Sequence, residues 1–511
     1  MKSLDFKALK DLVKIVNKNK IKQLEILGVT QFEDSKSEIL YEGILRDTFN
    51  SDDEAAEAIF GSFSKDPKYK KLRAKFFRQL VNTVFFIDFN ESMFTEQSRA
   101  ISNCYKDFAA AQLLQGRGAK VAAAFLLQQT LTQTDKLELT DLNSEIARTI
   151  VSNYGSTITD LTGFGKYLEL YRKYEKERAA EMKAFLYYKE LDMYYASSNS
   201  PNDEVFQKAS AYYEELQAME GEISTIRFLF HLFLIGMIKN SSGGTHHESL
   251  QLIESTLDNL KDRPSFTRGQ HQSILLQKLF CIAQLKLKSP DNQEEVFQHY
   301  FTLAREGDYP WFKGYEVKCF YYIGIQAYEE ALDAYLYACQ QSNYQRLTGM
   351  THDNFHLLLG YFYLLGELGV LDKDKIVNVC GEFKLGGYMN KFDVVEKDRE
   401  GMNIPIMLLP ILFDIVNPKE YGEKGRSGDA LDKYRQRYLE NDLNKRSACF
   451  LKLLLALINH PFDEANSEKK IQKELDILLD LKPDVNRQVY FIEVIPYEHL
   501  WEMLYKHVTG K

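Results

Sequence analysis

The stretch from Tyr315 to Gln341 constrains the fold of this chain most strongly, because it predicts two short helices joined by a tight turn. Each predicted helix has three residues at helical spacings of three and four: Tyr315, Cys319 and Tyr322, then Ala331, Tyr335 and Ala338. Small side chains alternate with large aromatic ones in these sets, a pattern that lets antiparallel helices approach closely. The stretch therefore predicts a helical hairpin.

This hairpin resembles a tetratricopeptide repeat, in which small and aromatic residues occupy fixed positions of two helices. The matching residues are Cys319, Tyr322, Ala331, Tyr335 and Ala338. The stretch departs from the family pattern at Lys318, where the family usually has Leu, and at Gln326, where it often has Gly. The resemblance implies an α-solenoid with a concave groove for a partner. The groove-facing positions that it implies are Lys313, Glu316, Phe320 and Ile323.

A second segment, residues 116–131 (GRGAKVAAAFLLQQTL), resembles a group of bacterial helical-repeat proteins. This resemblance rests on a glycine-containing break followed by an Ala-rich helix, and it implies no functional residue. It agrees with a helical array that begins well before the central hairpin.

Composition favours a helical protein in a reducing compartment. Only 11 prolines and 28 glycines interrupt the 511 residues, while 45% of the residues are hydrophobic. The six cysteines are scattered without a close CxxC pair, which predicts free thiols and a cytoplasmic location. Charged residues interrupt the apolar positions at the N-terminus, so we expect no signal peptide. A formal net charge of −9 argues against general polyanion binding by the whole chain, although a local basic face is compatible with it.

Hydrophobic periodicity predicts helices on both sides of the central hairpin. Helical hairpins are expected between 100 and 198, ending in one long helix from Tyr167 to Tyr195. Later helices are expected at 266–287, 291–306, 311–326, 327–341, 353–369, 430–439, 447–458, 467–481 and 499–507. The apolar runs Ile226–Ile238 and Ile404–Val416 are shorter than the roughly twenty residues of a membrane span, and predict buried helices.

We therefore expect an all-α fold built as an α-solenoid of tetratricopeptide-like hairpins, with a helical N-terminal region and an irregular helical C-terminal cap. Four regions are expected. Residues 1–95 form a helical region with a basic amphipathic helix, and 96–370 form the hairpin array, with a break at 240–244. Residues 371–428 form an irregular connection with a Gly-rich loop, and 429–511 form a C-terminal helical region.

The most basic stretch is the predicted helix 67–80, PKYKKLRAKFFRQL, which contains no acidic residue. The side chains expected to contact a polyanion are Lys68, Lys71, Lys75 and Arg78. The alternative is a docked helix whose basic side chains extend into water and meet acids from elsewhere in the chain.

Residue patterns for catalysis or metal binding are weak. His352 and His356 are four residues apart, as in zinc proteases, but the intervening glutamate is absent and no third ligand is indicated. His246 and His247 are expected to be exposed at a helix start. The glycines of YGEKGRSG (421–428) lack the ending of a phosphate-binding loop. We assign no catalytic, cofactor-binding or metal-binding residue and expect no cofactor.

These observations favour a non-catalytic scaffold or adaptor that holds another protein or a peptide in a concave groove, away from membranes. One alternative is a regulatory nucleic-acid-binding protein that uses the basic helix 67–80. Another alternative is an enzyme whose site is assembled from distant helices and is not visible from sequence.

Overall fold

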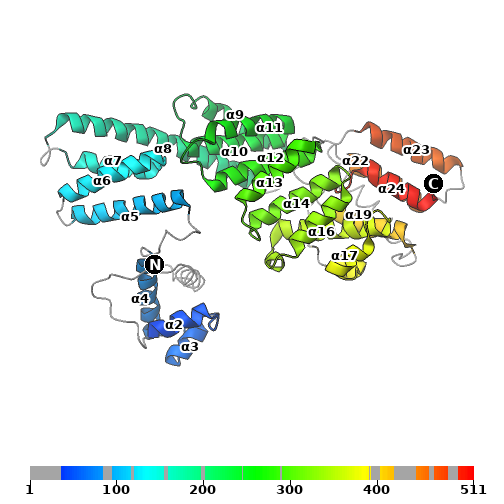
Figure 1. Ribbon diagram of the computed structural model, residues 1–511, viewed down its shortest axis with the longest axis horizontal. Helices are drawn as coiled ribbons and strands as arrows, with labels where there is room; N and C mark the ends of the chain where they lie inside the picture. The colour runs from blue at the N-terminus through cyan, green and yellow to red at the C-terminus, as the bar shows by residue number, and fades with distance from the viewer. Residues whose placement is uncertain are drawn as a thin grey trace. The chain divides into compact units, whose positions relative to one another are not determined.

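The structure is a computed structural model. It describes residues 36–84, 95–116, 120–154, 159–196, 202–243, 245–287, 290–390, 392, 403–418, 445–459, 465–481 and 493–510. In these ranges the regular structure is helical throughout and no strand occurs, which confirms the all-α prediction (Figure 1). The predicted N-terminal helix, the YGEKGRSG loop and the helix at 430–439 lie outside the described residues.

The chain divides into two compact units, Met1–Glu175 and Lys176–Lys511. The division falls within one long helix, α8 (Leu161–Ala196), so each unit contains part of it. This helix confirms the single long helix predicted for Tyr167–Tyr195. The division is coarser than the four regions expected from sequence.

The described part of the first unit starts with three helices, α2 (Lys36–Leu45), α3 (Asp52–Phe60) and α4 (Pro67–Val84). They pack around a small apolar core of Leu40, Ile44, Phe49, Ala55, Ala56, Tyr69, Phe76 and Leu80. The α3 helix starts where the side chain of Ser51 accepts a hydrogen bond from the amide of Glu54, and it ends at Gly61, whose φ is +61°. The left-handed Gly61 ends α3 six residues before α4 begins at Pro67.

The rest of the first unit contains α5 (Glu96–Gly116), α6 (Lys120–Lys136), α7 (Thr140–Ser152) and the beginning of α8. The α6 helix packs against both α5 and α7, so the predicted hairpins in this region are confirmed. Tyr174 of α8 is buried in the same core and donates a hydrogen bond to Asp135, at 2.8 Å.

The second unit continues with α9 (Asn202–Gln217), α10 (Ile226–Gly243), α11 (His246–Leu260) and α12 (Arg268–Leu285). The α10 helix packs against both α9 and α11. Burial on several sides accounts for its nearly continuous apolar sequence and confirms the prediction of a buried helix. Across the described ranges, each helix is too short or too polar to span a membrane.

The centre of the second unit consists of α13 (Pro290–Leu303), α14 (Tyr309–Gly324), α15 (Tyr328–Cys339), the short 3₁₀ helix η1 (Tyr344–Arg346), α16 (Gly349–Glu367) and α17 (Lys373–Cys380). The α12 helix packs on α14, and α14 packs on α16 (Figure 1). The α13 helix contacts α12 and α14, α15 contacts α14, and α17 contacts α16. The predicted hairpin of α14 and α15 is confirmed, and its small and aromatic residues are buried or half-buried.

The turn of that hairpin explains one departure from the repeat pattern. Gln326 stands where the repeat often has Gly, and its φ is +67°. A left-handed conformation favours Gly because it has no Cβ atom. The turn therefore holds a residue other than glycine in a backbone conformation that favours glycine.

The last helices are α18 (Leu385–Met389), α19 (Ile404–Val416), α22 (Lys445–Asn459), α23 (Ala465–Asp480) and α24 (Tyr497–Thr509). The α19 helix contacts α16, α22 and α24, so it lies in the core as the sequence predicted. Three helices, α17, α18 and α19, thus occur within the stretch 371–428 that was expected to be irregular. Pro405 at the start of α19 and Pro410 inside it do not prevent the helix from forming.

Candidate binding sites

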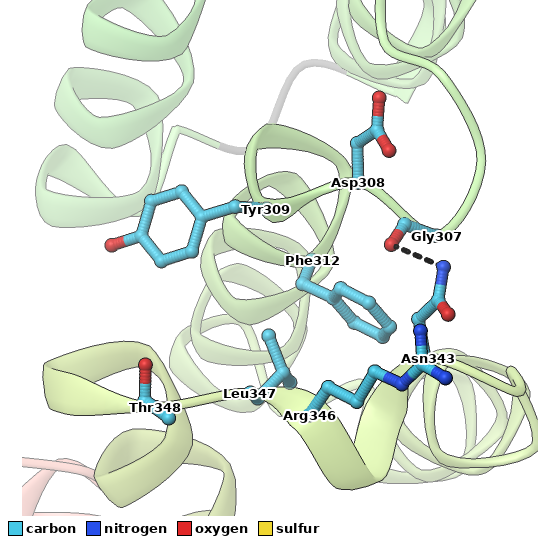
Figure 2. A pocket seen from close by; sticks show the side chains of 8 residues that line it. All are labelled: Gly307, Asp308, Tyr309, Phe312, Asn343, Arg346, Leu347 and Thr348. Atoms are coloured by element: carbon cyan, nitrogen blue, oxygen red, sulfur yellow. Dashed lines mark hydrogen bonds between the residues drawn. The ribbon is translucent and has the colours of Figure 1, made fainter. Parts of the chain in front are cut away.

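A cavity of about 370 Å³ opens between the start of α14 and the segment that joins α15 to α16. Its lining residues are Gly307, Asp308, Tyr309, Phe312, Asn343, Arg346, Leu347 and Thr348. Figure 2 shows the ring of Phe312 facing the side chains of Leu347, Asn343 and Arg346. Phe312 is buried, so it forms an apolar floor under more exposed neighbours.

The two loops that form the cavity are held together by a hydrogen bond. The side-chain amide of Asn343 donates to the carbonyl oxygen of Gly307 at 3.3 Å (Figure 2). Gly307 has a φ of +78°, and a Cβ atom there would lie 3.2 Å from the Asn343 amide nitrogen. Glycine therefore fits both the backbone conformation and the close approach of the second loop.

The rim of the cavity carries both signs of charge. Asp308 and Arg346 are exposed, and neither forms an ion pair with another residue that the structure describes. Asp308 precedes α14 and Thr348 precedes α16, but neither side chain accepts a capping hydrogen bond from its helix. A carboxylate, a guanidinium and a hydroxyl are thus available around an apolar floor, which suits a segment with one apolar side chain and charged neighbours.

The positions that the repeat resemblance assigned to a groove lie in the interior instead. Glu316, Phe320 and Ile323 are 1%, 3% and 0% exposed, and Lys313 is half-buried. The physical reason is that α12, α13, α15 and α16 all pack on α14. The least covered face of α14, at Tyr315, Lys318 and Tyr322, is itself half-buried. In this conformation the four side chains stabilise the core and present no groove surface.

A buried polar network occupies the first part of α14. Glu316 Oε1 accepts hydrogen bonds from Lys313 Nζ at 2.6 Å and from Asn354 Nδ2 at 2.8 Å. Burial is the main cause that raises the pKa of Glu316, and Lys313 opposes that shift. The carboxylate is enclosed by protein, so it is not accessible to a substrate in this conformation.

The predicted polyanion contacts lie on the surface of α4. Lys68, Lys71, Lys75 and Arg78 are all exposed and follow one another at spacings of three, four and three along a single helix face. None of the four forms an ion pair with a residue in the described ranges. The structure thus brings these four side chains together as one basic stripe.

The remaining charges of the three-helix region have other partners. Arg73 Nε lies 3.1 Å from Asp52 Oδ1, and Tyr69 donates a hydrogen bond to the same carboxylate. Asp53 accepts a hydrogen bond from the amide of Ser64. Asp66 accepts one from the amide of Lys68, at the start of α4. Asp52 and Asp53 therefore hold turns and helix contacts away from the basic stripe. Asp66 lies at the start of the stripe, where the hydrogen bond from the amide of Lys68, and to a smaller extent the charge of Lys68, lowers the pKa of its carboxyl group.

The histidines have packing roles. The ring of His356 lies 4.3 Å from that of Tyr388 and 4.7 Å from that of Phe392, measured between centroids. His246 is 4% exposed and contacts Phe280, so the expectation that it is exposed was wrong. Within the described residues, no group of three His, Cys, Asp or Glu side chains is placed to hold a metal ion.

Sequence reasoning found the basic stripe but missed the cavity. The stripe lies on one helix, where residue spacing alone defines a face. The cavity joins two loops separated by more than thirty residues, and the only local signals were Gly307 and the polar residues before α16. No protein-family model, no curated protein and no solved structure matches the chain.

Proposed function

We propose that this chain is a non-catalytic adaptor built on tetratricopeptide-like hairpins, and that it binds a protein partner at the cavity between the starts of α14 and α16. The observation that carries the proposal is the position of this cavity. It lies at one end of the α14–α15 hairpin, where the connection that enters from α13 meets the connection that leaves toward α16.

The order of helix contacts supports the repeat part of the proposal. The α12 helix packs on α14, and α14 packs on α16. Of the intervening helices, α13 contacts both α12 and α14, and α15 contacts α14. Stacked helical hairpins of a solenoid follow this contact order, in which each hairpin buries the apolar face of the one before. The six free cysteines fit the cytoplasmic location expected from sequence.

The composition of the cavity supports a peptide segment as its occupant. Its volume is at the low end of the range for ligand sites, which is enough for one or two side chains. The apolar floor at Phe312 suits an aliphatic or aromatic anchor. Asp308 and Arg346 suit flanking residues of opposite charge, because unpaired rim charges guide the orientation of a partner.

Site-specific photo-crosslinking in the native cells tests this proposal. A benzophenone amino acid replaces Tyr309, which is 56% exposed beside the cavity, and the captured protein is identified by mass spectrometry. We expect one main crosslinked partner. A second substitution, Arg346→Ala or Asp308→Ala, is expected to lower its yield about tenfold, equivalent to about 1.4 kcal/mol of binding free energy.

Tyr105 provides a matched control, since it is also an exposed tyrosine, at 50%, and lies on α5 in the other unit. The crosslinker at Tyr105 is expected to capture a different and weaker set of proteins. The same proteins at both positions, or a yield at position 309 that is unaffected by the Arg346 and Asp308 substitutions, would show that the cavity is not the partner site.

A further inference from the structure

The basic stripe on α4, formed by Lys68, Lys71, Lys75 and Arg78, lies outside the proposed partner site, and its side chains form no ion pair with the part of the chain that the structure describes. Its side chains are exposed, while the apolar face of the same helix packs through Tyr69, Phe76 and Leu80 into the core of α2, α3 and α4. Fold stability therefore depends on the opposite face of α4. The stripe needs another explanation.

The placement of the stripe is unfavourable for an isolated helix. Lys68 and Lys71 lie within the first five residues of α4, and the first turn contains no acidic residue. The positive end of a helix dipole disfavours cations at this position. A chain with a net charge of −9 has ample acids to pair with these cations. Asp66 accepts a hydrogen bond from the amide of Lys68, but Asp52 and Asp53 bind Tyr69 and Ser64, and none of the four stripe side chains forms an ion pair with a residue in the described ranges. An external anion would offset this unfavourable clustering.

We infer that the α4 stripe binds the phosphodiester backbone of a nucleic acid. From Lys68 to Arg78 the stripe is about 15 Å long at 1.5 Å per residue. A single strand of duplex DNA presents one phosphate for each 3.4 Å of helix axis, so a stripe of this length reaches several phosphates in a row. A row of cations on a rigid helix suits this regular array of charges.

The surroundings of the stripe favour nucleic acid over the other anionic partners. Binding to a lipid surface requires an apolar helix face beside the cations, and that face of α4 is already buried in the protein core. A specific acidic protein requires apolar or aromatic anchors among the charges. The described residues that flank the stripe on α4 include Pro67, Ala74 and Gln79, and Leu72 packs against the core, so this face of α4 presents no exposed aromatic anchor.

Electrophoretic mobility or fluorescence anisotropy with the full chain tests the inference. The probes are duplex DNA, duplex RNA, single-stranded RNA and polyglutamate, each between about 50 and 200 mM salt. Four phosphate contacts predict a slope near −3.6 for log affinity against log salt on duplex DNA, which weakens binding about 150-fold over this range. Preference for one nucleic-acid probe identifies the type of strand that is bound.

Two matched triple variants separate the stripe from general charge effects. Lys71→Gln, Lys75→Gln and Arg78→Gln together leave one contact, so the slope is expected to fall to about −0.9 and affinity at about 50 mM salt to fall at least tenfold. The control is Lys136→Gln, Lys166→Gln and Arg172→Gln, which removes three exposed cations from other helices of the same unit. We expect the control to bind like the original protein.

Several results would overturn the inference. These are no binding to any nucleic-acid probe at the lowest salt concentration, an unchanged slope in the α4 variant, and polyglutamate binding as tight as nucleic-acid binding. Circular dichroism and thermal unfolding of both variants show whether a loss of binding comes from a loss of folding. Since the four cations make no contact in the core, we expect both variants to unfold at the temperature of the original protein.

Discussion

The ammonium group of Lys313 lies 2.6 Å from Oε1 of Glu316, and the glutamate side of this ion pair is enclosed between α14 and α16. Asn354 of α16 donates a second hydrogen bond to the same oxygen. Burial nevertheless raises the pKa of Glu316, because the cost of removing the carboxylate from water exceeds the stabilisation by Lys313. The bond from Asn354 connects α16 to Glu316 of α14, and the burial of this carboxyl group makes the stability of the contact depend on pH.

We predict that Glu316→Gln becomes more favourable for folding as the pH rises. The ordinary pKa of a glutamate is 4.5, and the folded protein keeps the proton on Glu316 to a higher pH. The folded state then binds more protons than the unfolded state between these two pKa values, so the free energy of unfolding falls as pH rises through this window. The slope reaches at most about 1.4 kcal/mol per pH unit. Urea unfolding of both proteins from about pH 4 to 7 measures it.

Glu145→Gln is the control for this prediction. Glu145 forms an ion pair with Arg148 at 2.7 Å on the surface of the other unit, and its side chain is 47% exposed. An exposed pair of this kind contributes little to stability. The free energy of unfolding of Glu145→Gln, relative to that of the original protein, is therefore not expected to increase as pH rises. We expect the free energy of unfolding of Glu316→Gln, relative to that of the original protein, to increase as pH rises. A relative value that stays constant or decreases would contradict burial as the main cause of the raised pKa.

The positions of the helices could be predicted from the sequence more accurately than which helix faces are exposed to solvent. The long helix α8 and the hairpin of α14 and α15 followed from periodicity, because spacing within one segment determines an apolar face. Periodicity cannot reveal how many neighbours cover a helix. Phe320 was therefore assigned to an open groove, although four helices pack on α14 and this side chain is buried. The cavity near Arg346 depends on two distant loops, and no pattern within either loop predicts their meeting.

We predict that Arg446→Ala destabilises the C-terminal helices by about 3–5 kcal/mol, since it removes the guanidinium that pairs with the buried carboxylate of Glu493 and the half-buried one of Glu498. Arg446 is 9% exposed, and its guanidinium contacts Glu493 at 2.7 Å and Glu498 at 2.6 Å. It also donates hydrogen bonds to the carbonyl oxygens of Leu478 and Leu481 at the end of α23. We expect faster amide hydrogen exchange in α23 and α24, measured by mass spectrometry.

Two further variants define the role of Arg446. Arg446→Lys keeps the charge but loses the planar set of donors, so we expect it to restore only a small part of the lost stability. Lys261→Ala removes an exposed ion pair with Asp258 at 2.8 Å and is expected to cost less than about 1 kcal/mol. Equal hydrogen exchange in Arg446→Ala and Lys261→Ala would show that the buried network does not hold these helices.

We predict that Gly314→Ala lowers stability by about 1–3 kcal/mol through overpacking. A Cβ atom at Gly314 would lie 2.4 Å from the ring of Tyr300 and 3.0 Å from the ring of Phe301. Tyr300 has little freedom to move, because it is buried and its hydroxyl donates to the carbonyl oxygen of Pro310 at 2.5 Å. A lower thermal unfolding temperature is the expected result.

Gly269→Ala tests whether space rather than helix propensity explains that loss. Gly269 also lies in a helix, α12, but a Cβ atom there would have no neighbour within 4 Å. Alanine favours helix over glycine by about 0.5–1 kcal/mol, so this variant is expected to be equally or more stable. Destabilisation by Gly269→Ala comparable with that of Gly314→Ala would contradict the packing explanation.

Slow alkylation of the buried thiols is the last prediction. Burial raises the pKa of Cys281 to about 12, from an ordinary value of 9.0, and raises that of the fully buried Cys319 as well. The thiolate is the reactive form, so its fraction at neutral pH falls about a thousandfold at Cys281, and limited access slows the reaction further. Iodoacetamide labelling followed by mass spectrometry should give rates at both cysteines lower by roughly a thousandfold or more in the folded protein than in urea.

A thiol introduced on the surface makes that comparison internal to one sample. Ser342 is exposed in the segment after α15, so the thiol introduced by Ser342→Cys is expected to react in the folded protein at nearly its rate in urea. If Cys281 or Cys319 were labelled as rapidly as this introduced thiol under native conditions, α12 and α14 would open often enough to expose the core. Slow labelling would show that the core around these two helices stays closed on the timescale of the reaction, because labelling must wait for opening.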